Sequence, residues 1–181
     1  FASLTDYRPK LPVTLEADLR DYQREGFEWL AQRAEAQVGA CLADDMGLGK
    51  TLQVLALMLH TRQHGPHLVV CPTSVVANWR DQMIRFAPGL RPRLYEGKDR
   101  GDVLRDMQLG DVIIASYRIL LQDQAVLAGV EWNVALLDEA QFIKNPDSKT
   151  ARASYALKAR HRVATSGTPI ENRLSELWSI F

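Results

Sequence analysis

Residues 44–51 combine two glycines, a lysine and a threonine in the order that a phosphate-binding loop needs. They follow an apolar run at residues 40–43 and precede a stretch of helical periodicity, so they lie between an expected strand and an expected helix. Glycines let backbone N–H groups turn toward an anion, and the first turn of the helix adds the positive end of its dipole. We expect Lys50 to reach the β- and γ-phosphates of a nucleotide and the Thr51 hydroxyl to bind Mg²⁺. The loop residues predicted to bind the nucleotide are Asp45, Met46, Gly47, Leu48, Gly49, Lys50 and Thr51.

Two adjacent carboxylates, Asp138 and Glu139, follow another apolar run at residues 134–137. A nucleotide hydrolase needs one acid to hold Mg²⁺ and another to position or deprotonate the attacking water. We assign Asp138 to the metal and Glu139 to the water, and we count both, with Lys50, as candidate catalytic residues. Standing alone, the pair could equally cap a helix N-terminus. Its combination with a phosphate loop at a second strand end favours the catalytic interpretation.

Apolar runs and helical periodicities alternate along the chain. Strands are expected at residues 40–43, 68–71, 92–95, 111–115, 134–137 and 162–164, and helices at 19–34, 50–64, 75–86, from 117 onward, and at 148–158. The strand segments are mostly continuous apolar runs, which predicts an α/β fold with a parallel sheet covered by helices on both faces. Chemistry in such sheets gathers at the carboxyl ends of the strands, where the loop and the acidic pair both fall.

Composition narrows the class of protein further. The 181 residues suit one domain with a substantial core, and 46% of them are hydrophobic. Lys plus Arg equals Asp plus Glu at 22 each, so any contact with nucleic acid must come from a local patch. The two cysteines form neither a metal spacing nor a disulfide framework, which favours a reducing compartment. No signal peptide and no long apolar run is visible, so we expect no membrane span.

Six segments in a fixed order give the chain a resemblance to the Swi/Snf family of helicase-like ATPases, within helicase superfamily two. They are residues 19–26, 44–51, 71–79, 138–141, 143–145 and 166–174. The family also lacks the first glycine of the general phosphate-loop pattern, which accounts for Asp44. The sequence departs from the usual family residues at Asp21, where Pro is common, at Asp45, where Glu is usual, and at Gln141, where His is commoner. Thr165 and Ser166 replace the usual Leu-Thr pair.

The resemblance implies a RecA-like P-loop NTPase domain that uses ATP and Mg²⁺ to move along double-stranded DNA. It implies that Gln23 reads adenine, that Thr73, Ser74, Ser116 and Tyr117 lie on the DNA track, and that Ser166, Gly167 and Thr168 couple two lobes. The second RecA-like lobe would carry the arginine fingers, and we find no residues for it in this sequence. We therefore expect an entry segment at residues 1–17 and the first lobe at 18–181. The start at Phe1 and the apolar run to Phe181 suggest a piece of a longer protein.

Two other functions stay open: an RNA helicase of the same superfamily, and a module that binds nucleic acid and uses the nucleotide only as a switch. Expected partners are double-stranded DNA and a DNA-bound complex such as RNA polymerase or a nucleosome, in the cytoplasm (nucleoid) or the nucleus.

The arginine-rich stretch at residues 80–105 is interleaved with acids, so we interpret it as a solvated surface rather than a DNA patch. Trp79 could stack on a base, but on an amphipathic helix it is expected in the core.

Overall fold

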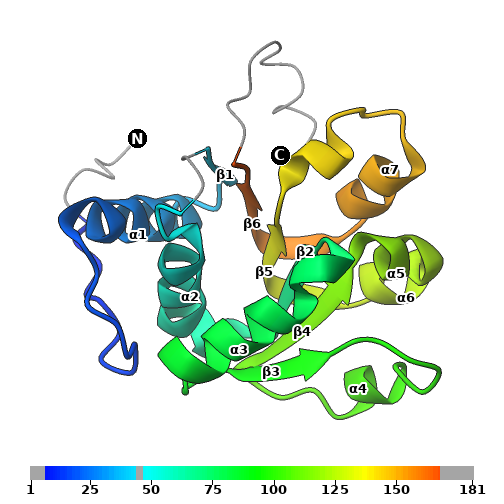
Figure 1. Ribbon diagram of the computed structural model, residues 1–181, viewed down its shortest axis with the longest axis horizontal. Helices are drawn as coiled ribbons and strands as arrows, with labels where there is room; N and C mark the ends of the chain where they lie inside the picture. The colour runs from blue at the N-terminus through cyan, green and yellow to red at the C-terminus, as the bar shows by residue number, and fades with distance from the viewer. Residues whose placement is uncertain (1–6, 44–46, 168–181) are drawn as a thin grey trace.

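The computed structural model describes residues 7–43 and 47–167, which form a parallel β-sheet with helices on both faces (Figure 1). The order of the six strands is β1-β6-β5-β2-β4-β3, and every pairing is parallel. The strands are β1 (Ala40–Leu42), β2 (His67–Cys71), β3 (Arg91–Leu94), β4 (Asp111–Ser116), β5 (Glu131–Leu137) and β6 (Lys158–Thr165). The predicted fold class is confirmed.

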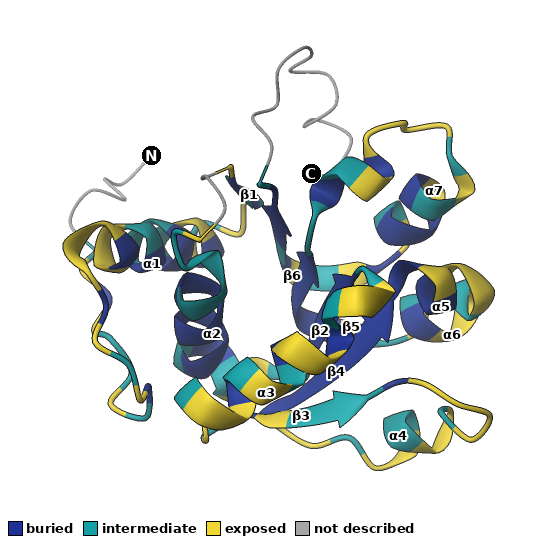
Figure 2. Ribbon diagram, viewed as in Figure 1, coloured by how far each residue is buried: buried dark blue, intermediate teal, exposed yellow. Residues whose placement is uncertain are grey.

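Helices on each face of the sheet complete a separate core. The helices are α1 (Asp21–Glu35), α2 (Lys50–Thr61), α3 (Val76–Phe86), α4 (Asp102–Arg105), α5 (Tyr117–Gln122), α6 (Gln124–Ala128) and α7 (Lys149–Tyr155). One core packs α1, α2 and α3 against Val69 and Cys71, and the other packs α5, α6 and α7 against Leu68 and Val70. Successive residues of β2 thus point to opposite faces, and both faces are covered, so the whole strand is buried (Figure 2).

Several elements differ from the boundaries that the sequence pattern predicted. Strand β6 begins at Lys158 rather than at residue 162, and helix α7 ends at Tyr155 rather than at residue 158. The early part of β6 pairs only with β5, because β1 is three residues long and meets β6 at Val163. Because this part of β6 has a neighbouring strand on one side only, it remains partly exposed and accommodates Lys158 and Arg160. These charged residues interrupt the apolar run by which the strand was predicted, so its start was placed too late in the sequence. The short helices α4 and α6 were not predicted.

Short 3₁₀ turns stand at the ends of three elements. Thr73–Val75 precedes α3, Arg62–His64 continues α2, and Ala140–Ile143 follows β5. The segment before α1 packs on the domain, because Leu15 and Leu19 are buried in the α1–α3 core. Its Tyr7 hydroxyl lies 3.0 Å from Nε2 of His60 on α2.

Candidate functional site

The phosphate loop contains two glycines in a backbone conformation that other residues disfavour. Gly47 has φ +83° and Gly49 has φ +75°, both in the left-handed region that an L side chain disfavours. Helix α2 then starts at Lys50, as predicted, and places Thr51 in its first turn. Asp45 and Met46, two of the predicted nucleotide-binding residues, lie outside the described residues.

Gln23 on α1 braces this loop. Its Nε2 donates a hydrogen bond to the backbone carbonyl of Leu48 at 3.1 Å, and its Oε1 accepts one from the backbone N–H of Arg20 at 3.0 Å. A Cβ atom at Gly49 would lie 2.2 Å from Nε2 of Gln23, so the amide and the loop are in direct contact. The amide keeps one N–H and one oxygen lone pair beyond these two bonds, which is what an adenine edge could use.

The acidic pair begins where β5 ends, and Asp138 is tightly held. Its backbone N–H donates to the carbonyl of Val70 at 2.8 Å, which extends the sheet by one residue. Its carboxylate accepts three hydrogen bonds: from Nε1 of Trp79 at 2.7 Å, from the Thr165 hydroxyl at 2.6 Å and from the Glu139 N–H at 3.0 Å. Trp79 is only 3% exposed, so the prediction that it belongs to the core is confirmed.

Glu139 adopts a left-handed conformation, φ 52° and ψ 59°, which is uncommon for a residue other than glycine. Such a conformation costs about 1–3 kcal/mol and is concentrated at functional sites. The Glu139 carboxylate accepts a hydrogen bond from Gln141, whose Nε2 donates to Oε2 of Glu139 at 2.7 Å. Gln141 in turn accepts a hydrogen bond from the Ser166 hydroxyl at 3.3 Å.

One cleft brings the loop and the acids together. A cavity of about 370 Å³ is lined by Gly47, Gly49, Lys50, Thr51, Asp138, Glu139 and Thr165, together with Trp79 and its neighbours on α3. The residues predicted for phosphate, metal and water chemistry therefore share one space, although the loop and the acidic pair are far apart in sequence. Of the predicted coupling residues, Ser166 is buried behind the acidic pair and Gly167 is half-buried, whereas Thr168 lies outside the described residues.

The four residues predicted for the DNA track divide into two exposed and two buried side chains. Thr73 and Ser74 are exposed in the turn before α3. Ser116 is 4% exposed and its oxygen caps α5 by accepting from the Ile119 N–H. Tyr117 is 6% exposed, and its hydroxyl donates to the backbone carbonyl of Asp138 at 2.8 Å. Burial, followed by the charge of Asp138, raises the pKa of Tyr117 well above its usual value, so the hydroxyl keeps its proton.

A second cavity, of about 340 Å³, lies beside these residues. Thr73, Ser116, Arg118 and Gly97 are part of its lining. Arg118 is exposed and makes no ion pair with any residue in the described ranges. The cavity thus offers hydroxyl groups, the cation of Arg118 and the carboxylate of Glu96 at the carboxyl edge of β2 and β4.

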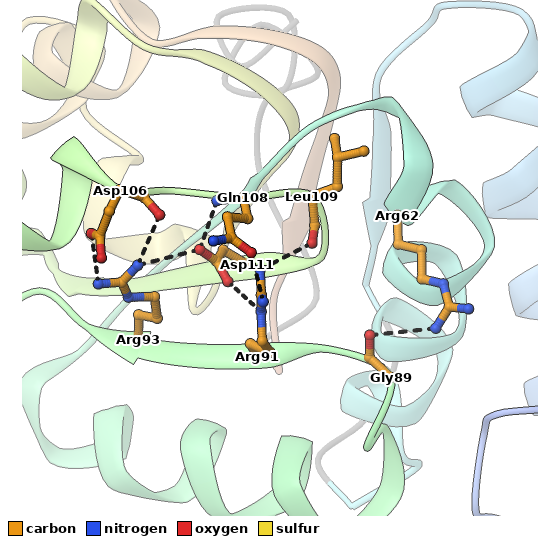
Figure 3. Close-up of polar contacts among 8 residues, drawn as sticks. All are labelled: Arg62, Gly89, Arg91, Arg93, Asp106, Gln108, Leu109 and Asp111. Atoms are coloured by element: carbon orange, nitrogen blue, oxygen red, sulfur yellow. Dashed lines mark hydrogen bonds and ion pairs between the residues drawn. The ribbon is translucent and has the colours of Figure 1, made fainter.

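Most arginines of the stretch at residues 80–105 form ion pairs, and Figure 3 shows those of Arg91 and Arg93. Arg91 and Arg93 both reach the buried carboxylate of Asp111, at 2.8 and 3.4 Å, and Arg93 also pairs with Asp106 at 3.0 Å. Further pairs are Arg80 with Asp81, Arg100 with Asp123 and Arg105 with Asp102. These contacts support its interpretation as a solvated, charge-balanced surface. The part taken by Asp111 and Asp123 was not predicted.

A strand–loop–helix phosphate site beside a strand-end acidic pair, on a parallel sheet of this order, defines a RecA-like P-loop NTPase lobe. Known proteins agree with this description. Residues 22–181 match the SNF2-related domain, and the chain belongs to this family of ATPase domains. The predicted Swi/Snf resemblance is confirmed.

Relatives and solved structures support the family assignment. The chain is 46% identical over 179 residues to "Putative ATP-dependent helicase/translocase YwqA" of Bacillus subtilis, covering 95% of this chain and 19% of that protein. It is 38% identical over 188 residues to the TATA-binding protein-associated factor mot1 of Schizosaccharomyces pombe, covering 94% of this chain and 10% of that protein. The Sulfolobus solfataricus SWI2/SNF2 ATPase core in complex with dsDNA matches with a TM-score of 0.85 and 42% identity, covering 96% of this chain and 37% of the other. The chain therefore spans about a fifth of the length of YwqA and a tenth of the length of mot1.

Among the described residues, no helix has the length and apolar character to cross a bilayer.

Proposed function

We propose that this domain is the ATP-binding half of a motor that moves along double-stranded DNA and remodels protein–DNA complexes. The observation that carries the proposal is the single cleft in which Lys50, Thr51, Asp138 and Glu139 meet. A pure binding module has no need of a water-positioning acid beside a metal-binding one, so this cleft favours hydrolysis over a nucleotide switch.

The residues of the cleft fit a Mg²⁺ ion bound with nucleotide phosphates. Mg²⁺ prefers oxygen ligands and is usually held by one or two carboxylates together with substrate phosphates. The Thr51 hydroxyl and the Asp138 carboxylate supply oxygen ligands that line the same cavity. When bound, the ion would neutralise charge that develops on the phosphate oxygens.

The chain's own residues would bind the phosphates, recognise the adenine and orient the attacking water. Lys50 would bind the β- and γ-phosphates while backbone N–H groups of residues 45–49 surround them, and Gln23 would read the adenine edge. Glu139 would orient the attacking water and take its proton. Its position is held through Gln141, which also contacts Ser166, and residues 166–168 would carry the state of the cleft toward a second lobe.

The proposed DNA track runs over the exposed turn at Thr73 and Ser74 and the cavity beside Ser116. Hydroxyl groups there suit phosphate contacts that do not depend on base sequence. Tyr117 would support this track without contacting DNA through its hydroxyl, because that hydroxyl is buried and donates to the backbone carbonyl of Asp138.

The double-stranded DNA named for the Sulfolobus ATPase core supports duplex DNA over RNA as the substrate. Relatives named mot1 and Helicase swr1 support a DNA-bound protein complex as the target.

ATPase assays test this proposal on a protein that joins residues 18–181 to a second RecA-like lobe. We expect the largest stimulation with duplex DNA, less with single-stranded DNA and least with RNA. Stimulation mainly by RNA would favour the RNA helicase alternative, and absence of any ATPase would favour the nucleotide-switched module.

A further inference from the structure

The carboxylate of Asp138 is gripped on both of its oxygens by buried side chains from the two flanking elements. Trp79 donates from Nε1 to Oδ2 at 2.7 Å, and Thr165 donates from its hydroxyl to Oδ1 at 2.6 Å. Their exposed fractions are 3% and 1%, so water does not compete strongly for either bond. Hydrogen bonds to a charged acceptor are about twice as strong as neutral ones.

The two donors reach Asp138 from opposite sides of β5. Thr165 is the last residue of β6, which pairs with β5 on one side. Trp79 lies on α3, which follows β2, the neighbour of β5 on the other side. The carboxylate direction is therefore set by elements on both sides of β5, in addition to the bond of 3.0 Å from the Glu139 N–H in the local turn.

We propose that Trp79 and Thr165 are positioning residues that orient Asp138 for the metal–nucleotide complex. The inference rests on the proposed function, in which Asp138 is a metal ligand. Three hydrogen bonds occupy three of the about four acceptor positions of the carboxylate, so one position on Oδ2 remains for a ligand in the cleft that Asp138 lines. Removing a group that orients a metal ligand typically costs about 10–100-fold in metal affinity or activity.

Thr165 is one of the positions at which the sequence departs from the usual family residues. The Swi/Snf resemblance puts leucine at this position, and a leucine side chain cannot donate a hydrogen bond. The hydroxyl of Thr165 therefore adds a contact to Asp138 that a leucine would lack.

Two conservative variants remove one donor each: Trp79→Phe keeps an aromatic ring and Thr165→Val keeps the side-chain shape. The domain offers matched controls. Trp132 is 1% exposed and its Nε1 donates to the Leu127 carbonyl at 2.9 Å, so Trp132→Phe loses an equivalent bond outside the cleft. Thr61 is 5% exposed and donates to the Leu57 carbonyl at 3.0 Å, so Thr61→Val is the control for Thr165→Val.

The measurement is the affinity for Mn²⁺ in the presence of ADP, by electron paramagnetic resonance, beside the Mg²⁺ concentration that half-saturates ATPase activity. It is made on the two-lobed protein. We expect about a tenfold or greater weakening of both in Trp79→Phe and in Thr165→Val. We expect no change in Trp132→Phe or Thr61→Val, even where these controls lower stability.

Asp138→Asn separates failure of this inference from failure of the proposed function. If Asp138→Asn abolishes metal affinity while both positioning variants bind Mn²⁺ as the wild type does, the positioning role is wrong and the metal assignment stands. If Asp138→Asn also binds metal normally, the metal assignment itself fails. Should Trp79→Phe not fold, Thr165→Val alone decides, because it changes neither volume nor packing appreciably.

Discussion

Gln141 holds the side chain of Glu139 by a hydrogen bond of 2.7 Å from its Nε2 to Oε2 of the carboxylate. The two residues lie in the turn after β5, and Glu139 is in the left-handed conformation there. The carboxylate is thus fixed next to Asp138 in the cleft that Lys50 also lines, which is where the proposed function requires the acid that orients the attacking water.

Glu139→Gln should therefore preserve ATP affinity and remove about two or more decades of turnover. The amide keeps the size of the side chain but can no longer accept a proton. Single-turnover hydrolysis and equilibrium nucleotide binding in the two-lobed protein check this. Glu131→Gln, at the exposed start of β5, is the control and should hydrolyse ATP normally. Near-normal turnover in Glu139→Gln would assign the water to another residue.

Gly49→Ala and Gly47→Ala should differ, although both glycines have positive φ. Each alanine pays about 1–2 kcal/mol for the left-handed backbone. At Gly49 the new Cβ would collide with Nε2 of Gln23, whereas at Gly47 it would have none of the described residues within 4 Å. We expect Gly49→Ala to weaken adenine nucleotide binding well beyond Gly47→Ala, as measured by calorimetric titration. Equal affinities would mean that the contact between Gln23 and the loop is not needed for binding.

DNA binding by this domain should be weak, independent of sequence and steeply dependent on salt, because phosphate contacts release counterions. Arg118→Ala should lower affinity for all duplexes alike and reduce the slope of the salt dependence by about one. Arg105→Ala is the matched control, since Arg105 is exposed but paired with Asp102. Fluorescence anisotropy at several salt concentrations measures both. Tight binding that ignores salt, or that prefers one sequence, would contradict this prediction.

Acid should destabilise the domain through His67. Burial, followed by the charge of His161, lowers the pKa of His67 to about 3 from an ordinary value of 6.5. The unfolded chain thus binds a proton that the folded chain refuses, so stability falls as the pH drops below about 6.5. Between pH 7.5 and 5 the loss from this residue is about 2 kcal/mol.

Urea unfolding at pH 7.5 and at pH 5 measures this loss. His67→Phe keeps a buried ring without a titrating group and should flatten the dependence on pH. His64→Asn, at an exposed histidine, should leave it as in the wild type. An unchanged slope in His67→Phe would show that other groups cause the acid sensitivity.

The fold and the cleft could be predicted from sequence because their signals are local. Apolar runs predict the parallel strands, and the residue types around Lys50 and Asp138 are those that a phosphate loop and a strand-end acidic pair require. The supports of the cleft could not be predicted in this way. Trp79 and Asp138 are separated by 59 residues, and their hydrogen bond depends on where α3 packs. The conformation of Glu139 likewise depends on tertiary contacts, as does the burial of Ser116 and Tyr117.

The most direct test of the central claim, that this chain is one half of an ATPase site, is nucleotide binding and steady-state hydrolysis on residues 1–181. We expect adenine nucleotide to bind with modest affinity and to lose that affinity in Lys50→Ala. Hydrolysis should stay close to background with or without duplex DNA, because the arginine finger of a facing lobe is typically worth about 10³–10⁵ in rate. DNA-stimulated turnover at ordinary motor rates, abolished in Lys50→Ala, would contradict the claim and show that these residues form a complete active site.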